Sequence, residues 1–156
     1  MILTTHILSG ALVGAEIKNP YAVAGLAVGL HFVLDILPHG DYLDKKSGWR
    51  EFWKVALDLA IGLGLIAALF FRRGETPFDF LYLRNIWIGI FFSLLPDGTT
   101  LLYWKMGMKF LKPIYVFHQK LHRASDFSPE RKFSFRNNPW DILISLASIF
   151  ALIIAR

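Results

Sequence analysis

Residues 21–42 read YAVAGLAVGLHFVLDILPHGDY, an apolar stretch that carries His31 and Asp35 in its second half and is stopped by Pro38. His31 and Asp35 are four residues apart, so a helix places them on one face, where they can bind one metal ion together. Ionisable side chains are costly in a membrane segment, and a segment that keeps one usually keeps it for function. The stretch therefore predicts a helix that ends at a metal site.

Further His and Asp side chains lie in or beside the other apolar segments, and His118 and His122 repeat the four-residue spacing. The turns at 38–41 and 96–98 put acidic groups just after predicted helix ends, where they can be directed back at the bundle. Imidazole and carboxylate ligands suit zinc, with manganese and iron as alternatives, and the chain has no Cys to supply a thiolate. The predicted metal ligands are His6, His31, Asp35, Asp41, Asp97, His118 and His122. For His39 and for Asp41, a ligand and an ordinary polar loop residue stay equally open.

The composition points to an integral membrane protein. The chain has 156 residues, of which 54% are hydrophobic and 19% charged, against about 45–50% and 25% in soluble domains. The excess lies in runs at about 3–17, 21–37, 50–71, 81–95 and 140–155. We predict an all-α fold with a single membrane-embedded domain, 1–156, made of about four to five transmembrane helices. Pro96 is expected to interrupt the fourth helix, and Gly25 and Gly29 to allow close helix packing around the second.

The segment at about 105–139 is predicted to lie at the membrane interface. Residues 109–123 alternate basic and apolar groups at roughly helical spacing, which is typical of an interfacial amphipathic helix. The net charge is +5, and the basic residues concentrate in loops that this topology places on the same side as the metal site. The positive-inside rule then puts the site at the cytoplasmic face of the cell (inner) membrane. Membrane lipids, and not nucleic acid, are the expected partners, because no nucleic-acid recognition motif is present.

Asp58 lies about two turns inside the third apolar run, in VALDLAIG. A carboxylate at that depth fits a metal ligand, a group that orients a ligand histidine, or a general base. A structural ion pair with a Lys or Arg is the alternative.

Taken together, these motifs resemble a family of small inner-membrane proteins described as membrane-bound metal-dependent hydrolases. The resemblance is carried by Thr5-His6 before a helix of small residues, the turn 38–41, Pro96-Asp97 and the late histidine pair. Ligand type and helical setting are also similar, more loosely, to the all-helical zinc-dependent phospholipase C and P1-type nuclease group. Gly40 and Gly98 stand where the hydrolase family commonly has a second acid, which implies fewer carboxylates than a full multinuclear site.

The resemblance implies that a divalent metal, zinc before the others, activates water for attack on a phosphate ester or diester, expected to be part of a lipid. Asp58 or Asp97 is implied as the general base. An anionic head group is then expected to be held by Lys109, Lys112, Lys120 and Arg123. Two alternatives stay open. A small ion or metal transporter predicts polar residues at several depths of the bundle, and a non-catalytic scaffold predicts a closed, four-ligand structural metal site.

Overall fold

The computed structural model describes residues 1–44, 46–72, 80–122 and 128–154, and these residues form helices and no β-strand. The all-α prediction is therefore confirmed. The α-helices are α1 (Leu3–Glu16), α2 (Pro20–Asp35), α3 (Trp53–Arg72), α4 (Phe80–Met106), α5 (Lys112–Leu121) and α6 (Pro139–Ile154). Short 3-10 helices are η1 (Trp49–Phe52), η2 (Lys109–Leu111) and η3 (Pro129–Arg131).

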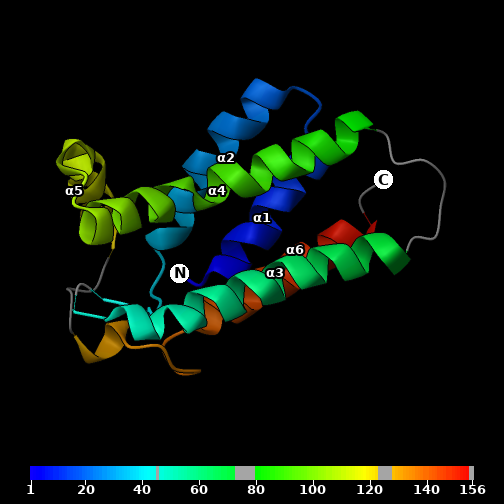
Figure 1. The fold of residues 1–156 in the computed structure, drawn as a ribbon. Helices are drawn as coiled ribbons and strands as arrows, with labels where there is room; N and C mark the ends of the chain where they lie inside the picture. The colour runs from blue at the N-terminus through cyan, green and yellow to red at the C-terminus, as the bar shows by residue number, and fades with distance from the viewer. Residues whose placement is uncertain (45, 73–79, 123–127, 155–156) are drawn as a thin grey trace.

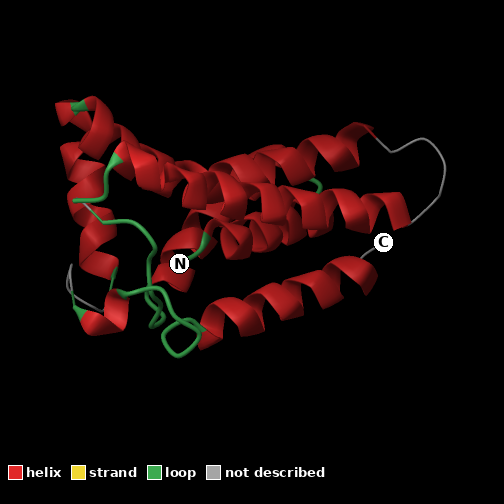
Figure 2. Ribbon diagram, turned by 60° about the horizontal axis from the view of Figure 1, so that its bottom comes forward, coloured by secondary structure: helices red, strands yellow, loops and turns green. Residues whose placement is uncertain are grey.

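Helix α1 is the centre of the bundle and packs against α2, α3, α4 and α6. These five helices run between the same two ends of the molecule, and α5 lies across the end that also holds the N-terminus (Figures 1 and 2). Most of the buried side chains in the apolar core come from α1 and the helices beside it, among them Ile7, Leu8, Ile66, Ile86 and Ile90.

The first turn of α1 is held by two carboxylates from neighbouring helices. Ile2, at the N-cap position, has no side-chain oxygen to cap the helix. Instead Asp58 of α3 accepts hydrogen bonds from the backbone N–H of Leu3 at 2.6 Å and of Thr4 at 3.1 Å, and Asp141 of α6 accepts from Ile2 N–H at 2.9 Å. Negative charge is favourable at the N-terminus of a helix, where backbone donors lack intrahelical partners. These bonds fix the start of α1 against α3 and α6.

Glycines let α1 and α4 come into backbone contact. A Cβ atom added at Gly10 would lie 2.5 Å from the carbonyl oxygen of Gly89, and one added at Gly89 would overlap the carbonyl oxygen of Gly10. The close approach allows the hydroxyl of Ser93 to donate to the backbone oxygen of His6 at 2.7 Å. The prediction of close packing at Gly25 and Gly29 is wrong, because both positions face open space.

Pro96 does not interrupt the fourth helix as expected, since α4 continues through it to Met106. Proline removes one backbone donor and crowds the preceding turn, but this weakens a helix without always ending it. Asp97 and Thr100 therefore lie on one continuous helix beside α5, rather than in a turn.

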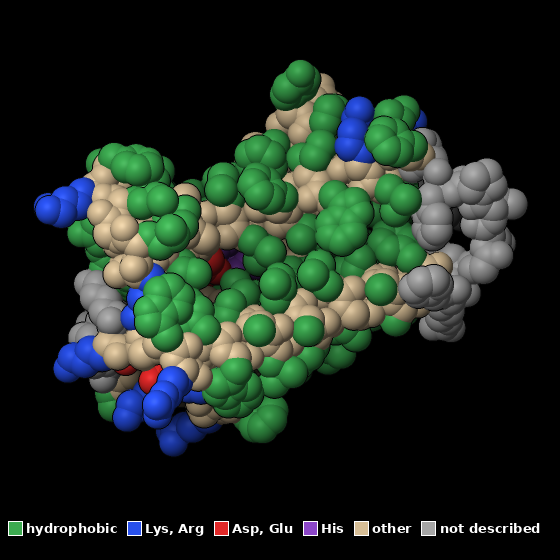
Figure 3. Space-filling model, in the orientation of Figure 1, with side chains coloured by type: hydrophobic (Ala, Val, Ile, Leu, Met, Phe, Trp, Pro, Cys, Tyr) green, Lys and Arg blue, Asp and Glu red, His purple; other side chains and the backbone are tan. Residues whose placement is uncertain are grey.

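Two helical segments, Trp49–Phe70 and Phe80–Met106, are long and apolar enough to cross a membrane. Helices α2 and α6 are apolar but shorter, with 16 residues each, so four to five spans are not confirmed. Large apolar side chains nevertheless point outward from several helices, as Val33, Leu57, Phe91 and Leu146 do, each more than half exposed. In the space-filling view such side chains cover the length of the bundle, while most Lys and Arg gather at the end that holds α5 (Figure 3).

Candidate metal centre

All five histidines of the chain converge on the buried carboxylate of Asp35. Each has a ring nitrogen within 4.0 Å of an Asp35 oxygen. They come from α1, from α2, from the segment after α2, from α5 and from the residue after α5: His6, His31, His39, His118 and His122. Segments far apart in the sequence thus build one site at the end of the bundle.

The first group of potential ligands is His31, Asp35, Asp97 and His118. Asp35 Oδ2 lies 2.7 Å from His118 Nε2 and 3.1 Å from His31 Nε2, and the two Nε2 atoms are 3.2 Å apart. Asp97 Oδ1 lies 3.8 Å from His118 Nε2. Ligand atoms at about 2.1 Å from a tetrahedral ion are about 3.4 Å from one another, so this spacing suits a metal ion.

The second group is His39, Asp41 and His122. His39 Nε2 lies 3.1 Å from His122 Nδ1 and 3.6 Å from Asp41 Oδ1. The two groups adjoin, because Asp35 also lies 4.0 Å from His39 and 3.8 Å from His122.

Oxygen atoms behind the imidazoles fix how three of the rings are turned. His31 Nδ1 donates to the backbone carbonyl of Ser93, and His39 Nδ1 to that of Leu37, each at 2.7 Å; Thr100 Oγ1 lies 3.0 Å from His118 Nδ1. Carbonyls only accept, so the first two rings carry a proton on Nδ1, and their Nε2 atoms face carboxylates, that of His31 at 3.1 Å from Asp35 and that of His39 at 3.6 Å from Asp41. A proton or a metal ion can lie between each such nitrogen and its carboxylate, and an imidazole held at Nδ1 by a carbonyl is typical of metal-binding histidines.

His6 is fully buried, and within the described part of the chain neither of its ring nitrogens makes a hydrogen bond. Its ring stacks on that of His31, with the centroids 4.1 Å apart, and its Nε2 lies 3.3 Å from Asp35 Oδ1 without hydrogen-bond geometry. Buried polar atoms are rarely left unsatisfied, so His6 is a further nitrogen donor beside Asp35, although it belongs to neither of the two groups of potential ligands described above.

A positive charge already lies between two of the carboxylates. The amino group of Met1 is 3.3 Å from Asp35 Oδ1 and 3.2 Å from Asp41 Oδ1. Burial alone lowers the pKa of this amine, but the carboxylates of Asp35 and Asp41, followed by Asp97 and Asp141, outweigh it and raise the pKa to about 11. Burial, and then the Met1 charge, lower the pKa of His39, which favours the neutral ring that a metal requires.

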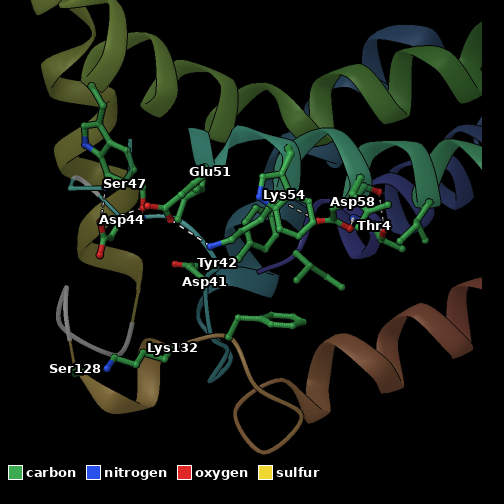
Figure 4. A pocket seen from close by; sticks show the side chains of 17 residues that line it. Thr4, Asp41, Tyr42, Asp44, Ser47, Glu51, Lys54, Asp58, Ser128 and Lys132 are labelled. Atoms are coloured by element: carbon green, nitrogen blue, oxygen red, sulfur yellow. Dashed lines mark hydrogen bonds and ion pairs between the residues drawn. The ribbon is translucent and has the colours of Figure 1, made fainter. Parts of the chain in front are cut away.

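Two cavities adjoin the centre. One of about 280 Å³ is lined by Asp41, Asp97, His118 and His122 among others. The other, of about 870 Å³, also reaches Asp41 and extends along α3 (Figure 4). The two share four lining residues, Asp41, Tyr42, Leu43 and Trp104, so they meet beside the second ligand group.

Asp58 lines the larger cavity and belongs to neither ligand group. Besides capping α1, its carboxylate accepts hydrogen bonds from Thr4 Oγ1 at 2.5 Å and from the Tyr42 hydroxyl at 2.9 Å. Burial, and then the charge of Asp58, raise the pKa of Tyr42, which therefore stays protonated as a donor. The structure thus gives Asp58 a set of structural partners.

The structure brings together every predicted metal ligand, His6, His31, Asp35, Asp41, Asp97, His118 and His122, and adds His39. The predicted head-group residues are placed differently. Lys109, Lys112 and Lys120 are exposed on η2 and α5 and line neither of the two cavities, whereas Lys54 and Lys132 line the larger one. Arg123 lies outside the described residues.

Sequence reasoning missed the groups that support the ligands. Thr100 lies three residues after Asp97, and that helical spacing was an available indication that it shares a face with a ligand. The Ser93 carbonyl and the Asp141 cap carried no such indication, because their partners are distant in the sequence.

No family model matches the chain, and no curated protein or solved structure is significantly similar to it. Function is therefore inferred from the geometry of the site.

Proposed function

We propose that this protein is a membrane-embedded, metal-dependent hydrolase that cleaves a phosphate ester or diester of a lipid. The observation that carries the proposal is the convergence of all five histidines, with Asp41 and Asp97, around the buried Asp35 beside two cavities. So many imidazoles around one carboxylate cost stability unless they bind a cation. The motifs that resemble the small inner-membrane metal-dependent hydrolases are the ones gathered here, which supports that family as a hypothesis.

A divalent cation held by His31, Asp35, Asp97 and His118 would lower the pKa of bound water and polarise a phosphoryl oxygen. The nitrogen and carboxylate donors suit zinc, and they also suit manganese or iron. Asp97 is the best-placed general base, because it contributes one oxygen to the first ligand group and its side chain, 29% exposed, lines the adjoining cavity, where the other oxygen can accept a proton from bound water.

An enzyme accounts for this centre better than a structural metal site does. Asp97, His118 and His122 all line the cavity of about 280 Å³, so water and substrate have room beside the ligands. The four donors of the first group match a closed structural site in number, so it is the cavity beside them, and not a free ligand position, that favours an enzyme. In the space-filling view, acidic and histidine atoms are visible in a hollow of the surface, in the half of the molecule that carries α5 (Figure 3).

The larger cavity favours a lipid as substrate. Trp53, Leu57 and Ile61 of α3 form its apolar wall, and each is exposed on the outer surface of a candidate membrane span. The lining also includes polar side chains, among them Lys132 and Lys54, which is paired to Glu51 at 3.2 Å. A molecule with an acyl chain and a phosphate can lie along this cavity with its polar end near Asp41 (Figure 4).

We further propose that the bundle crosses the cell membrane with the metal centre at the cytoplasmic face. The apolar outer surface supports burial in lipid. The basic side chains at the end that holds the centre support this orientation, because positive residues are retained on the cytoplasmic side.

The test is metal content and phospholipid hydrolysis of the detergent-purified protein. We expect bound zinc, manganese or iron, and release of phosphate or head group from mixed micelles of phosphatidic acid, phosphatidylglycerol or phosphatidylethanolamine. The His31→Ala/Asp35→Ala variant is expected to lose both, while Glu16→Gln, which removes an exposed carboxylate at the last residue of α1 that lines neither cavity, is expected to keep both.

The other outcomes identify the alternatives. Folded wild-type protein that binds no metal after divalent ions are added back contradicts the hydrolase. Metal without turnover of any phosphate ester favours a scaffold, and metal uptake into proteoliposomes favours a transporter.

A further inference from the structure

The two oxygens of Asp35 face different histidines. Oδ2 is approached by His118 at 2.7 Å, His31 at 3.1 Å and His122 at 3.8 Å. Oδ1 is approached by His6 at 3.3 Å and His39 at 4.0 Å. Asp35 therefore lies between the two ligand groups: His31 and His118 of the first approach Oδ2, while His39 and His122 of the second approach Oδ1 and Oδ2. A carboxylate in that position can bridge two cations.

The donors are also too many for one ion. Zinc takes four ligands in most protein sites, and His31, Asp35, Asp97 and His118 supply that number. A single ion there leaves His39, Asp41 and His122 as a second group, with His39 Nε2 at 3.1 Å from His122 and 3.6 Å from Asp41. That group has the ligand spacing of a metal site of its own.

We propose that the centre holds two divalent cations bridged by Asp35. His31, Asp97 and His118 bind the first ion together with Asp35, and His39, Asp41 and His122 bind the second together with Asp35. This inference rests on the proposed function and specifies its metal site. Two-metal sites, with ions about 3.5–4 Å apart, occur in phosphatases and nucleases, where the pair binds both the attacking and the leaving oxygen.

Charge and orientation support the second position. The Met1 amine contacts Asp35 Oδ1 and Asp41 Oδ1, so this position is suited to a positive charge, and a second ion bound there replaces the amine. His39 is turned by the Leu37 carbonyl so that its Nε2 faces inward, as His31 is turned by the Ser93 carbonyl. The resemblance implies fewer carboxylates than a full multinuclear site, and the second group accordingly has one carboxylate of its own, Asp41, with two nitrogen donors, His39 and His122. Asp41 also borders both cavities, so a substrate phosphate can reach this ion as well as the first.

The test is a count of ions on the full-length protein in detergent, stripped with a chelator and reloaded with manganese alone. Wild-type protein is expected to bind about two ions per chain, and their electron paramagnetic resonance spectrum is expected to show exchange coupling across the carboxylate bridge. His39→Ala/His122→Ala is expected to bind about one ion and to lose the coupling. Glu16→Gln, which removes an exposed carboxylate away from both cavities, is the matched control and is expected to resemble wild type.

The number of ions bound by wild-type protein can be measured even if the alanine variant fails to fold. In that case His39→Gln/His122→Gln is used in its place. One uncoupled ion per wild-type chain overturns the two-ion centre; if that protein hydrolyses phospholipid, the proposed function survives. Two ions that stay coupled in the folded His39/His122 variants also overturn the assignment of the second ligand set. Absence of any bound ion overturns both the centre and the hydrolase.

Discussion

Thr100 has no direct place in the ligand groups, yet its hydroxyl lies 3.0 Å from Nδ1 of His118 and is buried with it. Replacing Thr100 by Val keeps the shape and removes this bond, so the imidazole is less well oriented towards the ion. We expect metal affinity to fall about 10- to 100-fold, as is usual when a partner behind a ligand is lost. Competition with a chelator of known affinity measures the change.

Thr99→Val is the control for that experiment. The Thr99 hydroxyl donates only to the Pro96 carbonyl of its own helix, at 2.8 Å, and the substitution is therefore expected to leave metal affinity unchanged. Equal losses in the two variants would show that the helix, and not the bond to His118, sets the affinity.

The ligands could be predicted from the sequence better than the residues around them. His31 and Asp35 stand out because charged groups are costly in an apolar helix, and their spacing alone puts them on one face. His39 could not be separated from a loop residue, because its role depends on how the Leu37 carbonyl turns the ring. The cations of the larger cavity, Lys54 and Lys132, could not be predicted, because their position follows from the packing of α3 against a distant loop.

At the scale of the helix, Asp58 is explained by the first turn of α1, whose backbone donors and Thr4 hydroxyl it binds. Asp58→Asn removes the charge that this helix end favours and one acceptor. The free energy of unfolding is expected to fall by about 1–3 kcal/mol, with metal content unchanged. Chemical unfolding in detergent micelles and metal analysis test this, with Glu51→Gln as the control.

Asp58→Asn also distinguishes the two roles considered for Asp58, the cap of α1 and the predicted general base. A base contributes about 10²- to 10⁴-fold to the rate. If hydrolysis by folded, metal-loaded Asp58→Asn protein drops by such a factor, Asp58 acts in the reaction. A rate close to wild type leaves Asp97 as the base.

Close contact between α1 and α4 sets the relative positions of His6 and Asp97. Gly89→Ala forces a methyl group into the backbone of α1 at Gly10. We expect a loss of about 1–3 kcal/mol in the free energy of unfolding, accompanied by weaker metal binding because the helices that carry the ligands separate. Both quantities are measured on the same preparation.

Gly64→Ala on α3 is the matched control, because nothing lies within 4 Å of the added Cβ there. Alanine is a better helix former than glycine, so this variant is expected to gain about 0.5–1 kcal/mol. A gain in both variants would contradict the close contact of α1 with α4.

Helix positions could be predicted from the apolar runs, but the contacts between helices could not. The runs at 3–17 and 140–155 match α1 and α6 to within a few residues. Glycine content, however, does not say which helix faces which: Gly25 and Gly29 face outward, and Gly10 and Gly89 form the contact. Pro96 was expected to end a helix because its local cost is known, whereas the packing of α4 against α1, α2 and α5 that sustains the helix is not local.

Across the whole molecule, charge and apolar surface are separated along the axis of the bundle. The outer faces of α2, α3, α4 and α6 are apolar, and the end with α5 carries most of the described basic side chains and the metal centre. A phosphate ester in a lipid would meet the centre at that boundary without leaving the bilayer. The apolar runs of the sequence predict this separation of charge from apolar surface. The cavity along α3 could be found only from the structure.

The orientation can be tested with single cysteines, because the natural chain has none. Phe135, 86% exposed, lies in the segment before α6 at the end with the centre, and Tyr21, 87% exposed, lies at the opposite end, where α2 begins. The positive-inside rule places the first in the cytoplasm. A membrane-impermeant maleimide is therefore expected to label Tyr21→Cys in intact cells and Phe135→Cys only in inverted membranes. Labelling of both cysteines from one side of the membrane would mean that α2 does not cross it. Labelling of Phe135→Cys in intact cells and of Tyr21→Cys only in inverted membranes would put the centre outside, where it would act on lipids of the outer leaflet. Retained metal in each variant is the control for folding.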